Sequence, residues 1–205
     1  ETDSVWRQLR ASAEAASREE PQLGSQMNAV ILSHDDLAGA LSFQIARKLA
    51  DPEMSAMSVR EVCLSAFAAD PAMVAAAEAD LRAVAERDPA IRNLLQPFLY
   101  FKGFQALQGW RVAHWLWGQG RETLAFHFQS RISELFQLDI HPAARLGQGL
   151  FLDHGTGIVI GETTRIGRNC TIYQGVTLGG VSLHKGKRHP TLEDNVIVGV
   201  GAKVL

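Results

Sequence analysis

The order of apolar and polar residues changes character near residue 138. Before this point the chain is rich in Ala, Leu, Glu, Arg and Gln, which favour helices, and apolar residues recur at helical spacing. Segment 71–87 is amphipathic, with an Ala-rich face that allows close packing. We therefore expect residues 1–137 to form an α-helical domain.

An aromatic stretch at 97–117 belongs to this helical part. The sequence Gly118-Gln119-Gly120 predicts a break after it, and a last helix is expected over about 121–136. Large aromatic side chains at helical spacing indicate core or a subunit interface more readily than a ligand pocket.

After residue 138 a period of six replaces the helical period. Eleven aliphatic residues follow it: Ile140, Leu146, Leu152, Ile158, Ile160, Ile166, Ile172, Leu178, Leu192, Val198 and Val204. The phase slips by two residues between Ile158 and Ile160. Stacked hexapeptide coils of a parallel β-helix produce such a period, because one hexad cannot bury its apolar side chain alone. The sequence thus predicts an α+β protein, with a β-helix over 138–205.

Residues 179–191 interrupt the hexads. An insertion that leaves a stacked coil must project from a corner, and projecting loops on repeat scaffolds often bind ligands. This loop carries His184, Lys185, Lys187, Arg188 and His189. A solvated charged loop without function is the alternative interpretation.

Composition narrows the classes of protein. Hydrophobic residues make up 46%, charged residues 20%, and the net charge is −2, which argues against disorder and against a nucleic-acid partner. The two distant cysteines form no CxxC pair, so we expect no disulfide framework and a reducing, cytoplasmic location. No uncharged apolar run approaches the ~20 residues of a membrane span, and no membrane partner is expected. The chain begins without Met and ends inside the hexad pattern, so we expect it to be part of something longer.

Specific motifs sharpen this prediction. They are Asp139-Ile140-His141-Pro142-Ala143-Ala144, Leu152-Asp153-His154-Gly155-Thr156-Gly157, Ile160-Gly161-Glu162-Thr163, Gln174-Gly175-Val176-Thr177-Leu178-Gly179-Gly180 and Arg188-His189-Pro190. With Arg87-Asp88-Pro89-Ala90 and Tyr100-Phe101-Lys102-Gly103-Phe104 in the helical half, the whole chain resembles serine acetyltransferase. The resemblance implies a left-handed β-helix and transfer of acetyl from acetyl-CoA to L-serine, with no metal.

The resemblance also implies the catalytic residues. His154 matches the family's general base, and Asp139 matches the carboxylate that orients it. A serine hydroxyl is a weak nucleophile at neutral pH, and a histidine titrates in the range suited to remove its proton. Asp139 lies 15 residues before His154, and three hexads make a coil of 18, so contact between coils is possible but not forced. A structural histidine is the alternative.

Four further residues match the family's amino-acid pocket: Asp88, Asp153, Arg188 and His189. A carboxylate suits the substrate's ammonium group, and an Arg suits its carboxylate. Each has a plainer interpretation as well. Asp88 precedes Pro89 as a helix N-cap would, and Asp153 can fill a solvated corner.

The resemblance places acetyl-CoA in a groove between adjacent β-helices, with Gly180 and Val200 as backbone contacts and Lys203 near a phosphate. It also implies a homo-hexamer built as a dimer of trimers, inhibition by L-cysteine at the serine site, and binding of O-acetylserine sulfhydrylase through a C-terminal tail. That tail is absent from this chain.

Three alternatives remain open. A γ-type carbonic anhydrase would use His154, His184 and His189 as zinc ligands on the same scaffold. Another hexapeptide acetyltransferase would act on a sugar or antibiotic hydroxyl. A non-catalytic β-helix would only assemble partners.

Overall fold

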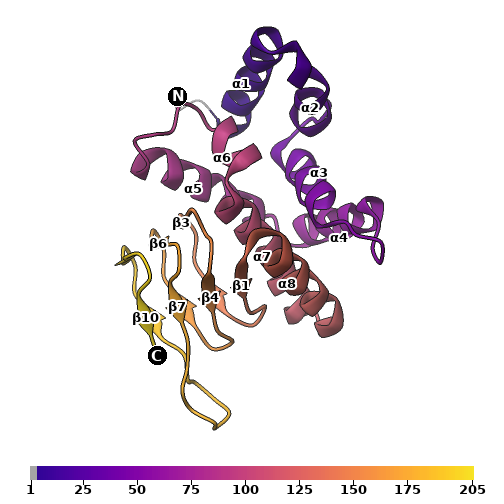
Figure 1. Cartoon of the computed structure of the whole chain (residues 1–205). Coiled ribbons are helices and arrows are strands. Elements are labelled where there is room, and N and C mark those ends of the chain that lie inside the picture. Colours follow the sequence, from indigo (N-terminus) through magenta and orange to yellow (C-terminus); the bar gives the residue numbers. More distant parts are fainter. Residues whose placement is uncertain (1–3) are drawn as a thin grey trace. The chain divides into compact units, whose positions relative to one another are not determined.

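Helices precede strands along the chain, and the change occurs between Phe136 and Leu138. The computed structural model describes residues 4–205 (Figure 1). The chain forms two compact units, one ending at Tyr100 and the other beginning at Phe101, so the last two helices belong to the same unit as the strands.

The first unit is entirely helical. Its elements are α1 (Val5–Glu19), η1 (Pro21–Leu23), α2 (Gly24–Met27), η2 (Asn28–Leu32), α3 (Leu37–Leu49), α4 (Ala56–Ala69), α5 (Ala72–Arg87) and α6 (Leu95–Tyr100). Helix α1 buries Val5, Leu9 and Ala13, which lie four residues apart and therefore on one face. Within residues 4–205 no single helix is long and apolar enough to cross a membrane, whereas the bent pair α4 and α5 meets that criterion only when taken together.

The predicted helix over 71–87 is confirmed as α5, but Asp88 does not begin another helix. The Asp88 carboxylate accepts a hydrogen bond from the backbone N–H of Ala90 at 2.9 Å, and the chain continues as a turn to Leu94. The physical reason is that an Asp before Pro serves a turn as well as a helix start. The N-cap interpretation of Asp88 is therefore wrong.

The second unit begins with α7 (Lys102–Gly118) and α8 (Glu122–Phe136). The predicted break at Gly118–Gly120 is confirmed, but the aromatic stretch is split, because Phe101 has an extended backbone between α6 and α7. Trp110 is 2% exposed and its indole N–H donates to the carbonyl of His141 at 3.0 Å. The aromatic side chain is thus core, and it anchors α7 to the first coil.

The rest of the second unit is a left-handed parallel β-helix, which confirms the predicted fold class. Its strands are β1 (Leu138–Ile140), β2 (Arg145–Leu146), β3 (Phe151–Asp153), β4 (Ile158–Ile160), β5 (Arg165–Ile166), β6 (Thr171–Tyr173), β7 (Thr177–Leu178), β8 (Thr191–Leu192), β9 (Ile197–Val198) and β10 (Lys203–Val204). They form three parallel sheets with orders β1-β4-β7-β10, β2-β5-β8 and β3-β6-β9.

Ten of the eleven hexad aliphatics stack in three columns, one for each sheet, whereas Ile158 pairs with Leu138. The paired residues are Ile140, Ile160, Leu178 and Val204 in one sheet, Leu146, Ile166 and Leu192 in the second, and Leu152, Ile172 and Val198 in the third. Ile160, Ile172 and Leu178 are at most 1% exposed. The columns form a continuous core, and the backbone pairing between coils fixes the height of every corner.

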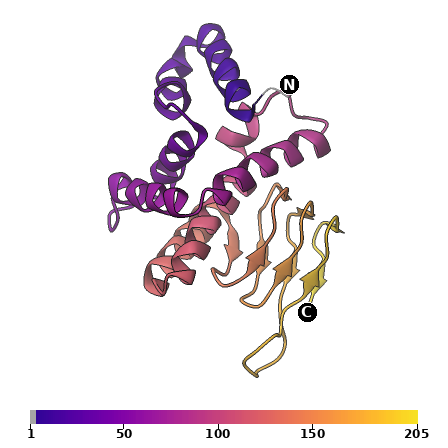
Figure 2. The same ribbon diagram turned by 180° about the vertical axis from the view of Figure 1, so that it is seen from behind.

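The two breaks in the period are insertions at corners. The longer insertion follows β7. Val159 pairs with Thr177 and Arg165 pairs with Thr191, so the six-residue step from Val159 to Arg165 lies beside a fourteen-residue step from Thr177 to Thr191. Figures 1 and 2 show the resulting loop projecting beyond the strands between β7 and β8. The projection predicted for residues 179–191 is confirmed.

Gly103 of α7 allows that helix to pass close to β3. A Cβ at this position would lie 2.0 Å from the carbonyl oxygen of Leu152. We expect Gly103→Ala to lower the free energy of unfolding by about 1–3 kcal/mol, because the added methyl group forces the backbone apart. Urea titration measures the change.

Gly118→Ala is the matched control, because a Cβ there meets no heavy atom within 4 Å at the end of the same helix. Equal unfolding midpoints for the two variants would contradict the proposed close approach.

Candidate functional site

His154 lies on a corner that is longer than its neighbour in the stack. Asp153 pairs with Tyr173 and Val159 pairs with Thr177, so five residues of one coil lie against three of the next. Gly157 stacks against Gly175, which places the two additional residues at His154 and Gly155. The phase slip in the sequence is therefore the corner that carries the candidate base.

The backbone of this corner is left-handed at both inserted residues, with φ of 58° at His154 and 84° at Gly155. A non-glycine residue in this region is uncommon and marks a position held by its surroundings. The His154 side chain is 71% exposed, so the imidazole points to solvent and not into the apolar columns. This is the orientation that a general base for an incoming substrate requires.

The start of α7 supports the same corner. The ammonium group of Lys102 donates a hydrogen bond to the Thr156 hydroxyl, and a Cβ on Gly155 would lie 3.4 Å from the Cα of Gly103. Gly155 is buried although His154 beside it is exposed. Helix α7 thus holds the backbone of the corner, while the His154 imidazole stays exposed to solvent.

The two carboxylates predicted near His154 differ in their contacts. Asp153 Oδ1 lies 3.7 Å from His154 Nε2. Asp139 Oδ1 accepts a hydrogen bond from the Gln129 side chain at 2.8 Å. Among residues 4–205, Asp139 and His154 share no hydrogen bond or ion pair, so the orienting role of Asp139 stays a prediction.

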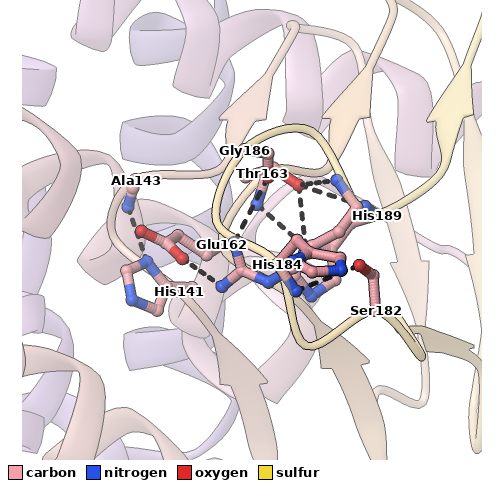
Figure 3. Close-up of polar contacts among 9 residues, drawn as sticks. His141, Ala143, Glu162, Thr163, Ser182, His184, Gly186 and His189 are labelled. Carbon is pink, nitrogen blue, oxygen red and sulfur yellow. Dashed lines mark hydrogen bonds and ion pairs between the residues drawn. The ribbon is translucent and has the colours of Figure 1, made fainter.

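Arg188 and His189 meet the Gly161-Glu162-Thr163 corner of the preceding coil. Figure 3 shows His189 beside Thr163 at this corner. The Arg188 guanidinium forms an ion pair and hydrogen bond with Glu162. The Thr163 hydroxyl lies 2.8 Å from Nδ1 of His189. The far end of the projecting loop is therefore attached to the β-helix at two predicted substrate-binding residues.

Lys187 attaches the loop a third time. Its ammonium group donates to the carbonyls of Thr163 at 2.8 Å and Pro190 at 3.1 Å, and also to that of His189. Gly180 lies at the other end of the loop, where a Cβ would lie 2.3 Å from the Arg188 carbonyl oxygen. The two ends of the loop thus touch through backbone atoms.

His141 lies beneath this cluster. Its Nδ1 accepts a hydrogen bond from the Ala143 backbone N–H at 3.0 Å, and its ring packs edge-on against Trp117 and Phe126. Burial lowers the pKa of His141, partly offset by the charge of Glu162. These contacts are those of a histidine with a structural role.

The charges of the loop contact explain two further pKa shifts. The hydrogen bond from Arg188 holds the pKa of Glu162 below its ordinary value. Burial, followed by the charge of Arg188, lowers the pKa of His189. At neutral pH the site therefore presents a charged Arg–Glu pair beside an uncharged imidazole.

The other predicted site residues are Asp88, Val200 and Lys203. Asp88 belongs to the first compact unit. Val200 is 65% exposed at a corner of the last coil. The Lys203 ammonium group donates to the Gly175 carbonyl and to the Thr177 hydroxyl at 3.1 Å.

The zinc alternative requires three histidines placed together. Among residues 4–205, no three His, Cys, Asp or Glu side chains are positioned to hold a metal ion. His154, His184 and His189 therefore do not form such a group within the described part of this chain.

Stacked hexads, an exposed histidine on an inserted corner and a basic projecting loop define a hexapeptide-repeat transferase. Residues 5–109 match the family model described as the N-terminal part of serine acetyltransferase. The serine acetyltransferase of Salmonella typhimurium is 49% identical over all 205 residues, which cover 75% of that protein. The chain belongs to the serine acetyltransferase family, and it is an acyltransferase.

Three solved structures share its fold. A serine acetyltransferase of Neisseria gonorrhoeae in complex with serine aligns with a TM-score of 0.96 at 44% identity, covering 98% of this chain and 82% of that one. A serine acetyltransferase complexed with cysteine aligns with a TM-score of 0.96 at 46% identity, covering 97% of this chain and 83% of that one. A serine acetyltransferase complexed with CoA aligns with a TM-score of 0.94 at 45% identity, covering 98% of this chain and 83% of that one.

Sequence reasoning missed the contacts that hold the loop. It named Glu162 and Thr163 only within a motif of the resemblance, yet these two residues bond Arg188 and His189. It did not predict that Gly161 meets the loop, although a Cβ there would lie 2.0 Å from the His189 ring. The Gly-Glu-Thr run at a corner was the available signal, but which loop it meets depends on the coil pairing.

The lowered pKa values of His141 and His189 predict acid sensitivity. The unfolded chain, with histidine pKa about 6.5, takes up protons before the folded chain does, so the free energy of unfolding decreases as pH falls below that value. Each histidine contributes a slope of at most about 1.4 kcal/mol per pH unit.

The measurement is urea unfolding at a series of pH values. The double variant His141→Gln, His189→Gln should show a flatter dependence than the wild type, whereas His184→Gln, in the exposed part of the loop, should keep it. A double variant with the wild-type slope would refute this origin of the acid sensitivity.

Proposed function

We propose that this chain transfers the acetyl group of acetyl-CoA to the hydroxyl of L-serine, giving O-acetyl-L-serine and CoA, as the first step of cysteine synthesis. The observation that carries the proposal is the exposed imidazole of His154 on an inserted, left-handed corner, in a chain of the serine acetyltransferase family. Acetyl-CoA is the co-substrate, and the relative solved with CoA supports that assignment.

In the proposed reaction His154 acts as general base. It removes the proton of the serine hydroxyl while the oxygen attacks the thioester carbonyl, and the imidazolium then returns the proton to the departing CoA sulfur. The bond to sulfur breaks as the ester bond forms, with no acyl-enzyme. Asp153, 3.7 Å from the imidazole, stabilises the positive charge, and Asp139 is proposed to orient the ring when substrate is bound.

The contact of Arg188 and His189 with Glu162 and Thr163 supplies the proposed amino-acid pocket. Arg188 binds the serine carboxylate, and His189 donates a hydrogen bond to it. Asp153 receives the ammonium group, with Asp88 assigned to the same pocket from the family resemblance. A relative solved with serine and another solved with cysteine support a pocket of this kind, and L-cysteine is the proposed feedback inhibitor.

The proposed CoA contacts lie on the last coils. Gly180 and Val200 offer backbone groups to the pantetheine arm, since Val200 is exposed and Gly180 has no side chain. Lys203 is proposed to approach a phosphate of CoA, for which it would exchange its bonds to Gly175 and Thr177.

Assembly and location are proposed from the family. We propose a hexamer built as a dimer of trimers, with acetyl-CoA between adjacent β-helices; a light-scattering mass of one chain would contradict it. O-Acetylserine sulfhydrylase is the proposed protein partner, from the family resemblance. Cys63 and Cys170 are both buried and form no disulfide among residues 4–205, which supports the proposed cytoplasmic location.

The proposed activity is tested by release of CoA thiol with different acceptors. Serine should support turnover, homoserine should be weaker because its hydroxyl lies one methylene farther from the carboxylate, and simple sugars should be inactive. Comparable turnover with a sugar would favour another hexapeptide acetyltransferase, and no turnover with any acceptor would favour a non-catalytic β-helix.

His154→Ala should lower kcat by about 10²–10⁴-fold, since a positioned base contributes that much, while CoA binding persists. Steady-state thiol release measures kcat, and calorimetry measures CoA binding. His184→Ala is the control because this exposed residue is assigned only in the zinc alternative. A His154→Ala enzyme with near wild-type kcat would remove His154 from the mechanism.

A further inference from the structure

The hydroxyl group of Thr163 uses all of its hydrogen-bonding capacity on the projecting loop. Its oxygen accepts hydrogen bonds from the backbone N–H groups of Arg188 at 2.9 Å and His189 at 3.0 Å. It also lies 2.8 Å from Nδ1 of the His189 ring. A hydroxyl has two lone pairs and one proton, so with both lone pairs occupied its proton goes to Nδ1.

A second donor reaches the same ring nitrogen. The backbone N–H of Thr163 lies 3.2 Å from Nδ1 of His189 and can only donate. Nδ1 therefore carries a lone pair. The proton of the neutral imidazole must lie on Nε2, so the ring offers an N–H donor on that side.

The position of the ring is fixed as well as its tautomer. Gly161 lies beneath it, where a Cβ would be 2.1 Å from Nε2. The Lys187 ammonium group also holds Thr163 in place, because it donates a hydrogen bond to the Thr163 carbonyl at 2.8 Å. Figure 3 shows the His189 ring beside Thr163, with the loop closing over both.

The neighbouring charges favour the uncharged ring. Besides burial, the charges of Arg188, Lys187 and His141 lower the pKa of His189, whereas the charge of Glu162 raises it. Burial and Arg188 lower the pKa of His189, which agrees with the uncharged form that the two donors at Nδ1 require.

We propose that Thr163 is a positioning residue that fixes the Arg188–His189 backbone and holds His189 in the Nε2–H tautomer, ready to donate to the carboxylate of the amino-acid acceptor. This inference rests on the proposed function, because a carboxylate is the group that such a donor would recognise. The opposite tautomer would direct a lone pair at the carboxylate and weaken binding.

Thr163→Val and Thr163→Ser form a matched pair. Val keeps the shape of Thr but loses the hydroxyl, and Ser keeps the hydroxyl. We expect Thr163→Val to raise the KM for serine roughly 10- to 100-fold, as loss of charge-assisted and backbone hydrogen bonds does, with a smaller effect on kcat. Thr163→Ser should restore a KM within about threefold of wild type.

A direct test of the tautomer does not use activity. The ring nitrogen-15 NMR signals of His189, assigned with a His189→Gln variant, should show an unprotonated Nδ1 and a protonated Nε2 in the wild-type chain at neutral pH. Thr163→Val should move part of the population to the other tautomer, because only the longer 3.2 Å backbone contact remains at Nδ1, and Thr163→Ser should retain the wild-type pattern.

The outcomes separate the two proposals. If the wild type shows no serine-dependent thiol release but has the expected tautomer, the proposed function fails and the positioning by Thr163 stands. If the wild-type Nδ1 is protonated, or if Thr163→Val keeps both the wild-type tautomer and the wild-type KM, the inference is overturned. The wild-type spectrum decides the question even if Thr163→Val does not fold.

Discussion

The pairing of one coil with the next is the constraint on which the rest of the second unit depends. Each hexad contributes one inward aliphatic residue and a short strand, and neither is stable alone. Pairing Ile140 with Ile160 and Ile160 with Leu178 removes both side chains and backbone groups from water. It also fixes which corner lies above which, so any additional residue has to leave the stack.

The candidate chemistry is found where residues leave the stack. The two-residue insertion at His154–Gly155 bends an exposed imidazole out of a corner whose counterpart in the next coil has no such insertion. The longer insertion returns to the stack at Thr191, and just before that point it carries Arg188 and His189. The regular coils form a rigid scaffold, and the two insertions carry the candidate functional groups.

Ordering a projecting loop costs conformational entropy, and the contacts of Glu162, Thr163 and Lys187 offset that cost. They lie at the end of the loop that carries Arg188 and His189, while residues 181–187 are exposed. The Arg188 guanidinium is thus held by an ion pair that a substrate carboxylate would have to share. The loop contact is both the anchor of the loop and the proposed carboxylate-binding part of the site.

The sequence alone determined the class of fold, because a strict period of six has few structural solutions, and its motifs were specific enough to indicate the family. It also marked both insertions as breaks in that period and predicted that 179–191 projects. Its alternative interpretation of Asp88 as an N-cap was wrong, since the local pattern for a helix start also suits a turn. It did not predict the loop contacts of Thr163 or Gly161. Their partners lie about 26 residues away, and only the register of one coil on the next, set by packing of the aliphatic columns, decides which corner the loop meets.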